Sequence, residues 1–237
     1  MAISLDVATA QAVAGATSNT WSHTCHADAK KLIVTLSFRV ATTNIAVTYA
    51  GVSMTEIPNT AQNGSTGANL RMFELSDPAD GANNVSASWT TASNCEGGAS
   101  SWKAGAGETI GLGTAASSNA STNNPSQAIT SEAGDVVVDG LACNIPTTGP
   151  TVAGGASNLY NALATNVYGA SSYKSAASSM SYSATNLNWA LGAVPLRPIA
   201  AASGNFFMVM FKDWKRVAGI LRPPAYGRLL LPNGAQI

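Results

Sequence analysis

The stretch LRMFELSDPADGANNVSASWT (residues 70–90) decides the fold class of this chain. Val85–Thr90 alternates apolar with polar residues, and Leu70–Leu75 does so except at Met72 and Phe73, which is typical of a strand that buries one face. Pro78 opens the segment between them and Gly81 closes it, as expected for a tight turn. The stretch therefore predicts two strands joined by a turn.

The same alternation recurs along the chain, broken by Gly, Asn, Asp and Pro. It predicts further strands at Ile3–Ala8, Asn19–Thr24, Lys31–Val40, Ile45–Tyr49, Val52–Ile57, Thr109–Leu112, Asp135–Cys143, Leu159–Tyr168 and Leu187–Leu196. YAGVSM predicts a hairpin turn about Ala50-Gly51. Helical periodicity is nearly absent before residue 200. We expect an all-β body, residues 1–200, built as a two-sheet antiparallel β-sandwich of jelly-roll type, with a C-terminal arm at 201–237.

Charge is scarce and unevenly distributed. Charged residues make up 10% of the chain, against about a quarter in typical soluble domains. Residues 1–203 hold 7 basic and 11 acidic side chains, a net charge of −4, and residues 204–237 hold 5 basic and 1 acidic, a net charge of +4. The two regions have opposite sign and are expected to attract each other, within one subunit or between subunits.

The cysteines and the N-terminus indicate a protein made in the cytoplasm. Cys25, Cys95 and Cys143 are scattered and odd in number, which argues against a secreted disulfide framework, so we expect three free thiols. The first residues, MAISLDVATA, lack the basic region and apolar core of an export signal. The longest apolar run, Phe206–Phe211, is far shorter than the roughly 20 residues of a membrane span.

Several segments, in this order, resemble a recurrent β-sandwich domain of phage and environmental bacterial genomes. They are WSHTC (21–25), KLIVTLSF (31–38), VTYAGVSMT (47–55), LRMFELSDPADGANNVSASW (70–89), EAGDVVVDGLAC (132–143) and NWALGAVPLRP (188–198). The resemblance covers residues 15–198 and stops before the C-terminal arm. It implies a concanavalin-like jelly roll of the kind found in virion and surface proteins.

Motifs for catalysis are scarce. The chain has no Gly-x-Ser-x-Gly elbow, no phosphate loop ending in Gly-Lys-Ser/Thr and no His-Glu-x-x-His helix. The run Gly105–Gly107 lacks the third glycine of a dinucleotide loop and is interpreted as a plain loop. Glycosidases need two facing carboxylates, and only Glu74 and Glu108 suggest such a pair. We therefore expect no enzymatic activity and no cofactor.

Two short clusters contain side chains of the kinds that bind metal ions. His23, Cys25 and His26 fall within four residues, and on a strand His23 and Cys25 face the same side. Zinc takes four ligands, and no second cluster exists; a buried cysteine beside a hydrogen-bonded histidine is the preferred interpretation.

The second cluster is Asp77, Asp80 and Asn83, which share one loop. They offer three side chains where calcium takes about six to eight oxygens. We interpret them as turn-capping residues and predict no metal site in either cluster.

Aromatic residues raise a second class of function, because sugars stack on exposed rings. Most aromatic residues lie on predicted strands and are assigned to the core. Trp102 and Tyr173 are expected in Ser/Gly-rich loops and are the candidate glycan contacts. A carbohydrate-binding module for host-surface or glycan recognition is therefore the alternative function.

The C-terminal segment, 204–237, concentrates aromatic, aliphatic and basic residues. As a helix it would carry an apolar stripe opposite Lys212, Asp213, Lys215 and Arg216, and RPPAYGRLLLPNG after it must be extended because of its two adjacent prolines. The alternative is one more strand at Phe206–Phe211 followed by a disordered end. The residues expected at an assembly interface are Phe207, Met210, Phe211, Trp214, Val217, Leu221, Tyr226 and Leu230.

These observations predict a non-enzymatic structural protein of a phage virion, held by its C-terminal arm. Capsid decoration or head fibre is the first assignment, and a tail-fibre or baseplate component the second. The expected partners are other virion proteins, copies of the same chain and a host-surface glycan. Nucleic acid is disfavoured by the net charge of zero, and a membrane by the lack of an export signal.

Overall fold

The computed structural model describes residues 3–63, 67–144, 149–185 and 188–200, together with 216–217 and 220–221. The chain divides into two units, Met1–Ala201 and Ala202–Ile237. All regular secondary structure in the described residues is β-strand, and every strand pair is antiparallel. The prediction of an all-β body is confirmed.

The first sheet contains the first eight strands of the chain, in the order β4-β3-β8-β2-β7-β5, with β1 paired to β8 and β6 to β7. Their bounds are β1 (Ser4–Cys25), β2 (Ala29–Phe38), β3 (Ala46–Tyr49), β4 (Val52–Ser53), β5 (Thr55–Glu56), β6 (Gln62–Asn63), β7 (Asn69–Ser76) and β8 (Gly81–Lys103).

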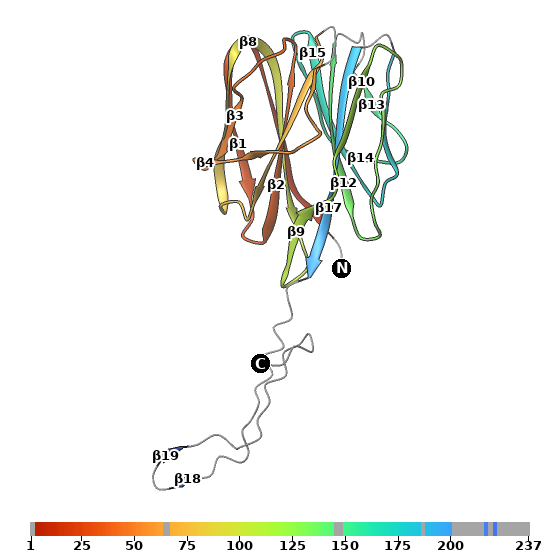
Figure 1. Ribbon diagram of the computed structural model, residues 1–237. Coiled ribbons are helices and arrows are strands. Elements are labelled where there is room, and N and C mark those ends of the chain that lie inside the picture. The colour runs from red at the N-terminus through yellow and green to blue at the C-terminus, as the bar shows by residue number, and fades with distance from the viewer. Residues whose placement is uncertain are drawn as a thin grey trace. The chain divides into compact units, whose positions relative to one another are not determined.

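The second sheet has the order β10-β17-β12-β15-β14, with β9 paired to β17, and a third, smaller sheet has the order β11-β16-β13. Their strands are β9 (Glu108–Leu112), β10 (Ala116–Ala120), β11 (Ser126–Ala128), β12 (Val136–Asn144), β13 (Thr151–Val152), β14 (Ser157–Ala164), β15 (Val167–Ser175), β16 (Ser179–Ser183) and β17 (Asn188–Ala200). Figure 1 shows the first sheet and the second sheet as neighbouring halves of the body.

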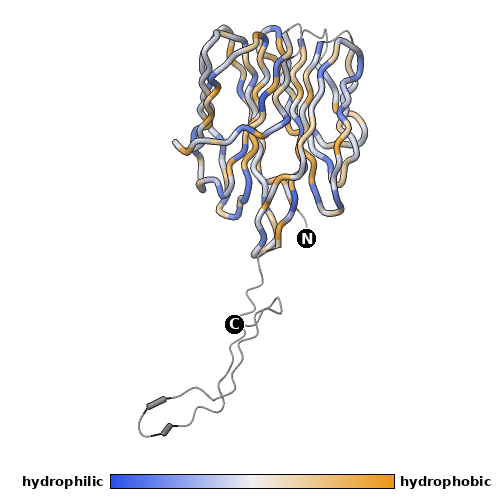
Figure 2. Tube along the Cα trace, in the orientation of Figure 1, coloured by the Kyte–Doolittle hydropathy of each residue, from blue (hydrophilic) through white to orange (hydrophobic). Residues whose placement is uncertain are grey.

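The central strands β2 and β12 are buried on both faces. Leu32 and Leu36 on β2 belong to the core enclosed by the first sheet, whereas Ile33 belongs to the core shared with the second sheet. On β12, Val138 faces that shared core, and Leu141 faces a further core that includes Tyr182 of β16. The body is therefore layered, and hydrophobic segments run along its strands in Figure 2.

The first sheet is built on a long ribbon that folds back on itself. β1 and β8 have 22 and 23 residues and pair along nearly their whole length. Their register is irregular between Val13 and Ser18, next to Gly15 with its positive φ of 58°. His23 from the second half of β1 contacts Thr9 of the first half, with Nδ1 and Oγ1 2.8 Å apart. The bend thus lays one half of the ribbon over the other.

A short connection nearly closes the first sheet around its core. β4 pairs with β3 and β5 pairs with β7, and only Met54 separates β4 from β5. The turn before β4 is the predicted one: Ala50 and Gly51 have φ of 49° and 79°, as a two-residue hairpin turn of the primed kind requires. Residues 52–56 thereby join β4 and β5, which lie at opposite ends of the strand order of the first sheet.

Glycines let the two large sheets approach each other closely. A Cβ on Gly98 of β8 would overlap the ring of Tyr160 from β14, and a Cβ on Gly169 of β15 would overlap the carboxyl group of Glu96 from β8. On the other face of β8, the ring of Trp21 occupies the space that a Cβ on Gly97 would take. Adjacent glycines on one strand therefore accept large side chains from opposite sides.

Several predicted strand boundaries are wrong. Ile3–Ala8 and Asn19–Thr24 are parts of one bent strand, β1. Predicted strand Leu159–Tyr168 contains a turn at Thr165, which has a positive φ of 54°, and is divided into β14 and β15. The predicted turn after β7 is confirmed, since β7 ends at Ser76 and β8 begins at Gly81.

In the C-terminal unit the structure describes four residues. They form two short paired strands, β18 (Arg216–Val217) and β19 (Ile220–Leu221), in which Val217 pairs with Ile220. The other residues of the expected apolar helix and extended arm lie outside the described part of the chain.

Replacing Gly98 with alanine is expected to destabilise the body by about 1–3 kcal/mol, because the new methyl group displaces the buried ring of Tyr160. The measurement is chemical denaturation of Gly98→Ala, Tyr160→Ala and the double variant. Removing the ring makes room for the methyl group, so the double variant should lose less stability than the sum of the single losses. Additive losses would show that the ring does not press on Gly98.

Candidate functional site

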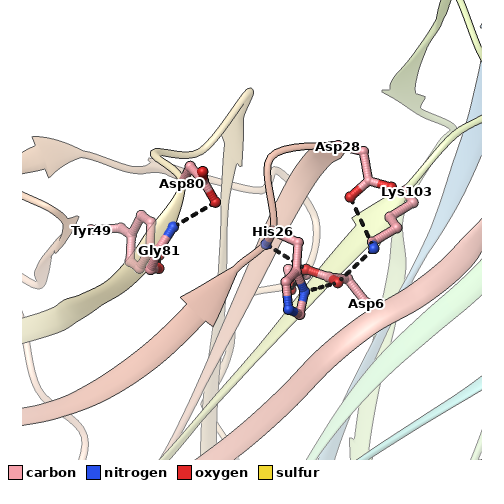
Figure 3. Close-up of polar contacts among 8 residues, drawn as sticks. Asp6, His26, Asp28, Tyr49, Asp80, Gly81 and Lys103 are labelled. Carbon is pink, nitrogen blue, oxygen red and sulfur yellow. Dashed lines mark hydrogen bonds and ion pairs between the residues drawn. The ribbon is translucent and has the colours of Figure 1, made fainter.

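The densest polar cluster that the structure describes surrounds Asp6, near the start of β1 (Figure 3). The Asp6 carboxylate accepts a hydrogen bond from the backbone nitrogen of His26 at 3.0 Å and lies 2.6 Å from its ring Nδ1. It also accepts a hydrogen bond from Ser101 Oγ at 3.0 Å and forms an ion pair with Lys103 at 3.1 Å. Lys103 pairs in turn with Asp28 at 2.9 Å. The cluster thus joins both strands of the long ribbon to the β1–β2 turn.

The contacts within this cluster favour the charged forms of Asp6 and Lys103. The Asp6 side chain is 1% exposed. Burial alone would raise the pKa of Asp6, but the hydrogen bonds from His26, Lys103 and Ser101 outweigh it and lower the pKa to about 2. Asp28 and Asp6 raise the pKa of Lys103. The carboxylate and the ammonium group therefore keep their charges at neutral pH, as in a structural ion pair.

The order of contacts differs from that of a hydrolytic triad. In a triad the histidine lies between the nucleophile and the carboxylate, so that it can take the proton of the nucleophile. Here the carboxylate of Asp6 lies between Ser101 and His26. The contacts of Ser101 and His26 thus fix Asp6 and do not activate the hydroxyl group.

His23 and Cys25 point into the core enclosed by the first sheet, as predicted from their spacing. They are 1% and 0% exposed. Burial lowers the pKa of His23 to about 4, partly offset by Asp6, and burial raises the pKa of the Cys25 thiol. At neutral pH the imidazole is uncharged and the thiol protonated, which is the opposite of an activated cysteine–histidine pair. Cys95 and Cys143 are likewise buried and free.

Glu96 on β8 is a buried acid that sequence reasoning missed. It is 0% exposed, and neither carboxyl oxygen has a hydrogen-bond partner within the described structure. Burial raises the pKa of Glu96 well above its usual range. Nearby on β14, the side chain of Tyr160 is also buried, and burial raises the pKa of its hydroxyl group well above the usual range. Glu96 is therefore protonated and packs as a neutral side chain against Gly169.

Asp139 on β12 is a second buried acid that was not singled out, and this one is fully hydrogen-bonded. Its carboxyl oxygens accept hydrogen bonds from Ser172 N at 2.6 Å, Ser172 Oγ at 2.9 Å and Tyr182 Oη at 2.7 Å. Burial raises the pKa of Asp139 to about 7 against these three donors. Asp139 thus ties β16 and β15 to β12. A carboxylate inside the apolar run VVVDGLAC was the signal that marked it in the sequence.

The loop residues considered for calcium act as turn residues. Asp80 Oδ1 accepts a hydrogen bond from Gly81 N at 2.8 Å, and Asn83 Nδ2 donates to the carbonyl of Asp80 at 3.1 Å. Asp77 forms an ion pair with Lys30 at 3.8 Å. Within the part of the chain that the structure describes, no group of three or more His, Cys, Asp or Glu side chains is placed to hold a metal ion.

The two glutamates considered for glycosidase chemistry have separate structural partners. Glu74 on β7 pairs with Lys31 at 2.5 Å. Glu108 on β9 accepts a hydrogen bond from Gly105 N at 3.0 Å, so the Gly-rich loop is closed by its own chain. The two carboxylates lie in different sheets, and each is already engaged.

The placement of Trp102 and Tyr173 in loops is wrong, because Trp102 lies on β8 and Tyr173 lies on β15. Trp102 is 0% exposed, and its Nε1 donates to Ser100 Oγ at 3.0 Å. Its ring packs edge-on against Tyr173 of β15, with centroids 5.3 Å apart. As placed, the indole offers no face to a sugar, and Tyr173 is half-buried.

An open hollow of about 590 Å³ lies beside β10 and β11. It is lined by three hydroxyl-bearing and three apolar residues: Thr114, Ala116, Ala128, Ile129, Thr130 and Ser178. Among the described residues its lining contains neither a charged group nor an aromatic ring, which are the groups that anchor and orient a small ligand.

The residues predicted for an assembly interface lie almost entirely outside the described part of the chain. Six of the eight lie outside it: Phe207, Met210, Phe211, Trp214, Tyr226 and Leu230. Val217 and Leu221 lie on β18 and β19.

Comparison with protein-family models, curated proteins and solved structures finds no match to this chain. The described residues include no helix that is long and apolar enough to cross a membrane. Function is therefore inferred from the chain's own residues.

The buried acids predict a stability that falls as pH rises. In the unfolded chain, Glu96 and Asp139 lose their protons as the pH rises above their ordinary pKa values of 4.5 and 3.8. In the folded chain, burial raises the pKa of Glu96 well above 4.5 and that of Asp139 to about 7, so both carboxyl groups keep their protons to a higher pH. Each retained proton lowers the free energy of unfolding by about 1.4 kcal/mol per pH unit. The measurement is urea denaturation between pH of about 4.5 and about 7.5.

Glu96→Gln is the matched variant, because glutamine keeps the size of the side chain but does not titrate. Its free energy of unfolding should fall less steeply with pH than that of the original chain. At lower pH the free energy of unfolding should instead fall as the pH falls, because Asp6, whose pKa is about 2, loses its ion pairs when it is protonated. An identical slope in Glu96→Gln would show that Glu96 is ionised in the folded state.

Proposed function

We propose that this chain is a non-enzymatic structural protein of a phage virion. Its jelly-roll-type body is displayed on the particle, and the C-terminal segment 204–237 attaches it to neighbouring subunits. Capsid decoration or a head fibre is the first assignment.

The observation that carries the proposal is the contrast between the body and the C-terminal segment. In the described body only four large hydrophobic residues are exposed, Val40, Val52, Leu163 and Ile199, and single exposed residues of this kind do not form an association surface. The C-terminal segment instead concentrates Phe207, Phe211, Trp214 and their apolar neighbours within a local charge of +4. A free monomer that exposed them would aggregate, so they require cover.

The chemistry of the body supports a structural role. The groups most suited to catalysis are either buried without charge, as His23 and Cys25 are, or held in ion pairs, as Asp6 is. Most charged side chains of the body pair with one another, for example Lys31 with Glu74 and Arg197 with Asp135. Glycan binding by the body loses its main candidate, because Trp102 is buried.

The energy available to the C-terminal segment is sufficient for attachment. Burying four or five of its large side chains at roughly 1.5–3 kcal/mol each gives a gross gain of about 6–15 kcal/mol per subunit. Ordering the segment removes part of this gain. Repetition around a symmetric particle makes even a modest remainder effective.

Deleting residues 204–237 is expected to leave a folded body that no longer assembles. Circular dichroism should show an unchanged β spectrum, and analytical ultracentrifugation should show a monomer where the full chain forms oligomers. In particles purified from infected cells, the truncated protein should be missing. Unfolding of the truncated chain would instead assign the segment to the core of its own body, and normal assembly would make it dispensable.

Two paired substitutions separate apolar burial from charge. Phe211→Ala with Trp214→Ala should weaken assembly more than Lys215→Ala with Arg216→Ala, because burial of the rings supplies most of the gain. Equal losses, or a larger loss from the basic pair, would indicate that the segment binds through its charge.

A further inference from the structure

The turn between β7 and β8 holds the carboxyl group of Asp80 against the backbone nitrogen of the next residue. We propose that Asp80 is a self-modification site, where aspartate converts to isoaspartate through a cyclic imide formed with Gly81. The reaction needs no enzyme and no cofactor, and it is independent of the function proposed above.

The chemistry balances with water alone. The backbone nitrogen of Gly81 loses its proton and attacks Cγ of Asp80. One carboxyl oxygen leaves as water, which closes a five-membered imide. Water then opens the ring at either carbonyl: opening at one restores aspartate, and opening at the other leaves the main chain running through the side-chain methylene group. The product is an isomer with the same mass.

The local geometry favours the first step. Gly81 N lies 2.8 Å from Asp80 Oδ1 and donates a hydrogen bond to it (Figure 3). Gly81 has a positive φ of 87°, and a Cβ built on it would meet nothing within 4 Å. Glycine therefore leaves the nitrogen open to approach by the carboxyl group. Asp80 is exposed, so water reaches the imide.

The chain contains a second Asp-Gly pair that serves as an internal control. Asp139 is fully buried, and Ser172 and Tyr182 hold its carboxyl group in three hydrogen bonds. The side chains of Thr35 and Leu70 pack against Gly140. Asp139 must therefore leave its partners, in a locally unfolded state, before it reacts.

Asp77 provides a control within the same turn. It is exposed like Asp80 but precedes Pro78, whose nitrogen carries no proton and cannot form the imide. Asp77→Glu thus matches Asp80→Glu in charge and location without touching the reactive pair.

The modification has a structural consequence at the start of β8. Gly81 pairs with Cys25 at the end of the β1–β8 ribbon, and its carbonyl accepts a hydrogen bond from Tyr49 Oη at 3.1 Å. An additional main-chain methylene group immediately before Gly81 displaces that carbonyl. Isomerisation should therefore loosen the contact of Tyr49 with the ribbon.

The test is incubation of the full chain at neutral pH and body temperature, followed by site-resolved peptide mapping with fragmentation that distinguishes the isomers. We expect isoaspartate at Asp80 to exceed that at Asp139 at least about ten-fold, because Asp139 reacts only after local opening. In urea the two sites should react at similar rates. Asn63-Gly64 and Asn233-Gly234 can also give isoaspartate, but loss of ammonia changes their mass and identifies them.

Asp80→Glu should abolish the product in its peptide, since a longer side chain would need a six-membered ring, and Asp77→Glu should leave it unchanged. Hydrogen exchange of the first residues of β8 should rise with age in the original chain and in Asp77→Glu, but not in Asp80→Glu. Absence of isoaspartate at Asp80, or equal amounts at Asp80 and Asp139 in the folded protein, would overturn the proposal.

Discussion

The close approach of other strands to both faces of β8 is the contact on which the rest of the body depends. Gly97 receives the ring of Trp21 from the folded ribbon, and Gly98 receives the ring of Tyr160 from the second sheet. One strand therefore serves two cores, because neither position has a side chain of its own. The same principle applies at Gly169 and Gly140, where Glu96 and Thr35 fill the space. At Gly97 and Gly98 the missing side chains let other strands pack closely against both faces of β8.

The body combines a low content of charged residues with acids that are deeply buried. A body with few charged residues has covered Glu96 and Asp139 completely, and it holds them by different means. Asp139 receives three hydrogen bonds, whereas Glu96 has none within the described structure and avoids the cost of a buried charge by keeping its proton. At Asp6, by contrast, the hydrogen bonds from His26, Lys103 and Ser101 lower the pKa and keep the carboxylate charged. The acids of this chain therefore differ in protonation because burial raises the pKa of Glu96 and Asp139, whereas the hydrogen bonds of Asp6 outweigh the effect of its burial.

The sequence predicted strands well where a strand separates an apolar face from a polar one. Val85–Thr90 alternates buried with less buried residues and lies within β8, and Ala50-Gly51 forms the predicted turn. It failed for β10 (ASSNA), where every residue is half-buried or exposed, and for β16 (SMSYS), where only Met180 and Tyr182 are buried, because their Ser, Ala and Asn residues resemble those of loops. Trp102 was misplaced for the same reason. The polar cluster of Asp6 could not be predicted, since Ser101 and Lys103 reach it only through pairing across some 95 residues of sequence.

The pairing of β1 with β8 also dictates when the body can form during synthesis. Ser4 finds its partner only at Lys103, so the first strand leaves the ribosome long before the strand that completes it. The intervening segments, including β2, likewise pair with β8 or with strands that depend on it. Such distant pairing makes folding slow, because a long loop must close before its contacts contribute. Until β8 emerges, the nascent chain exposes a long unpaired edge, and this interval is when it depends most on protection from aggregation.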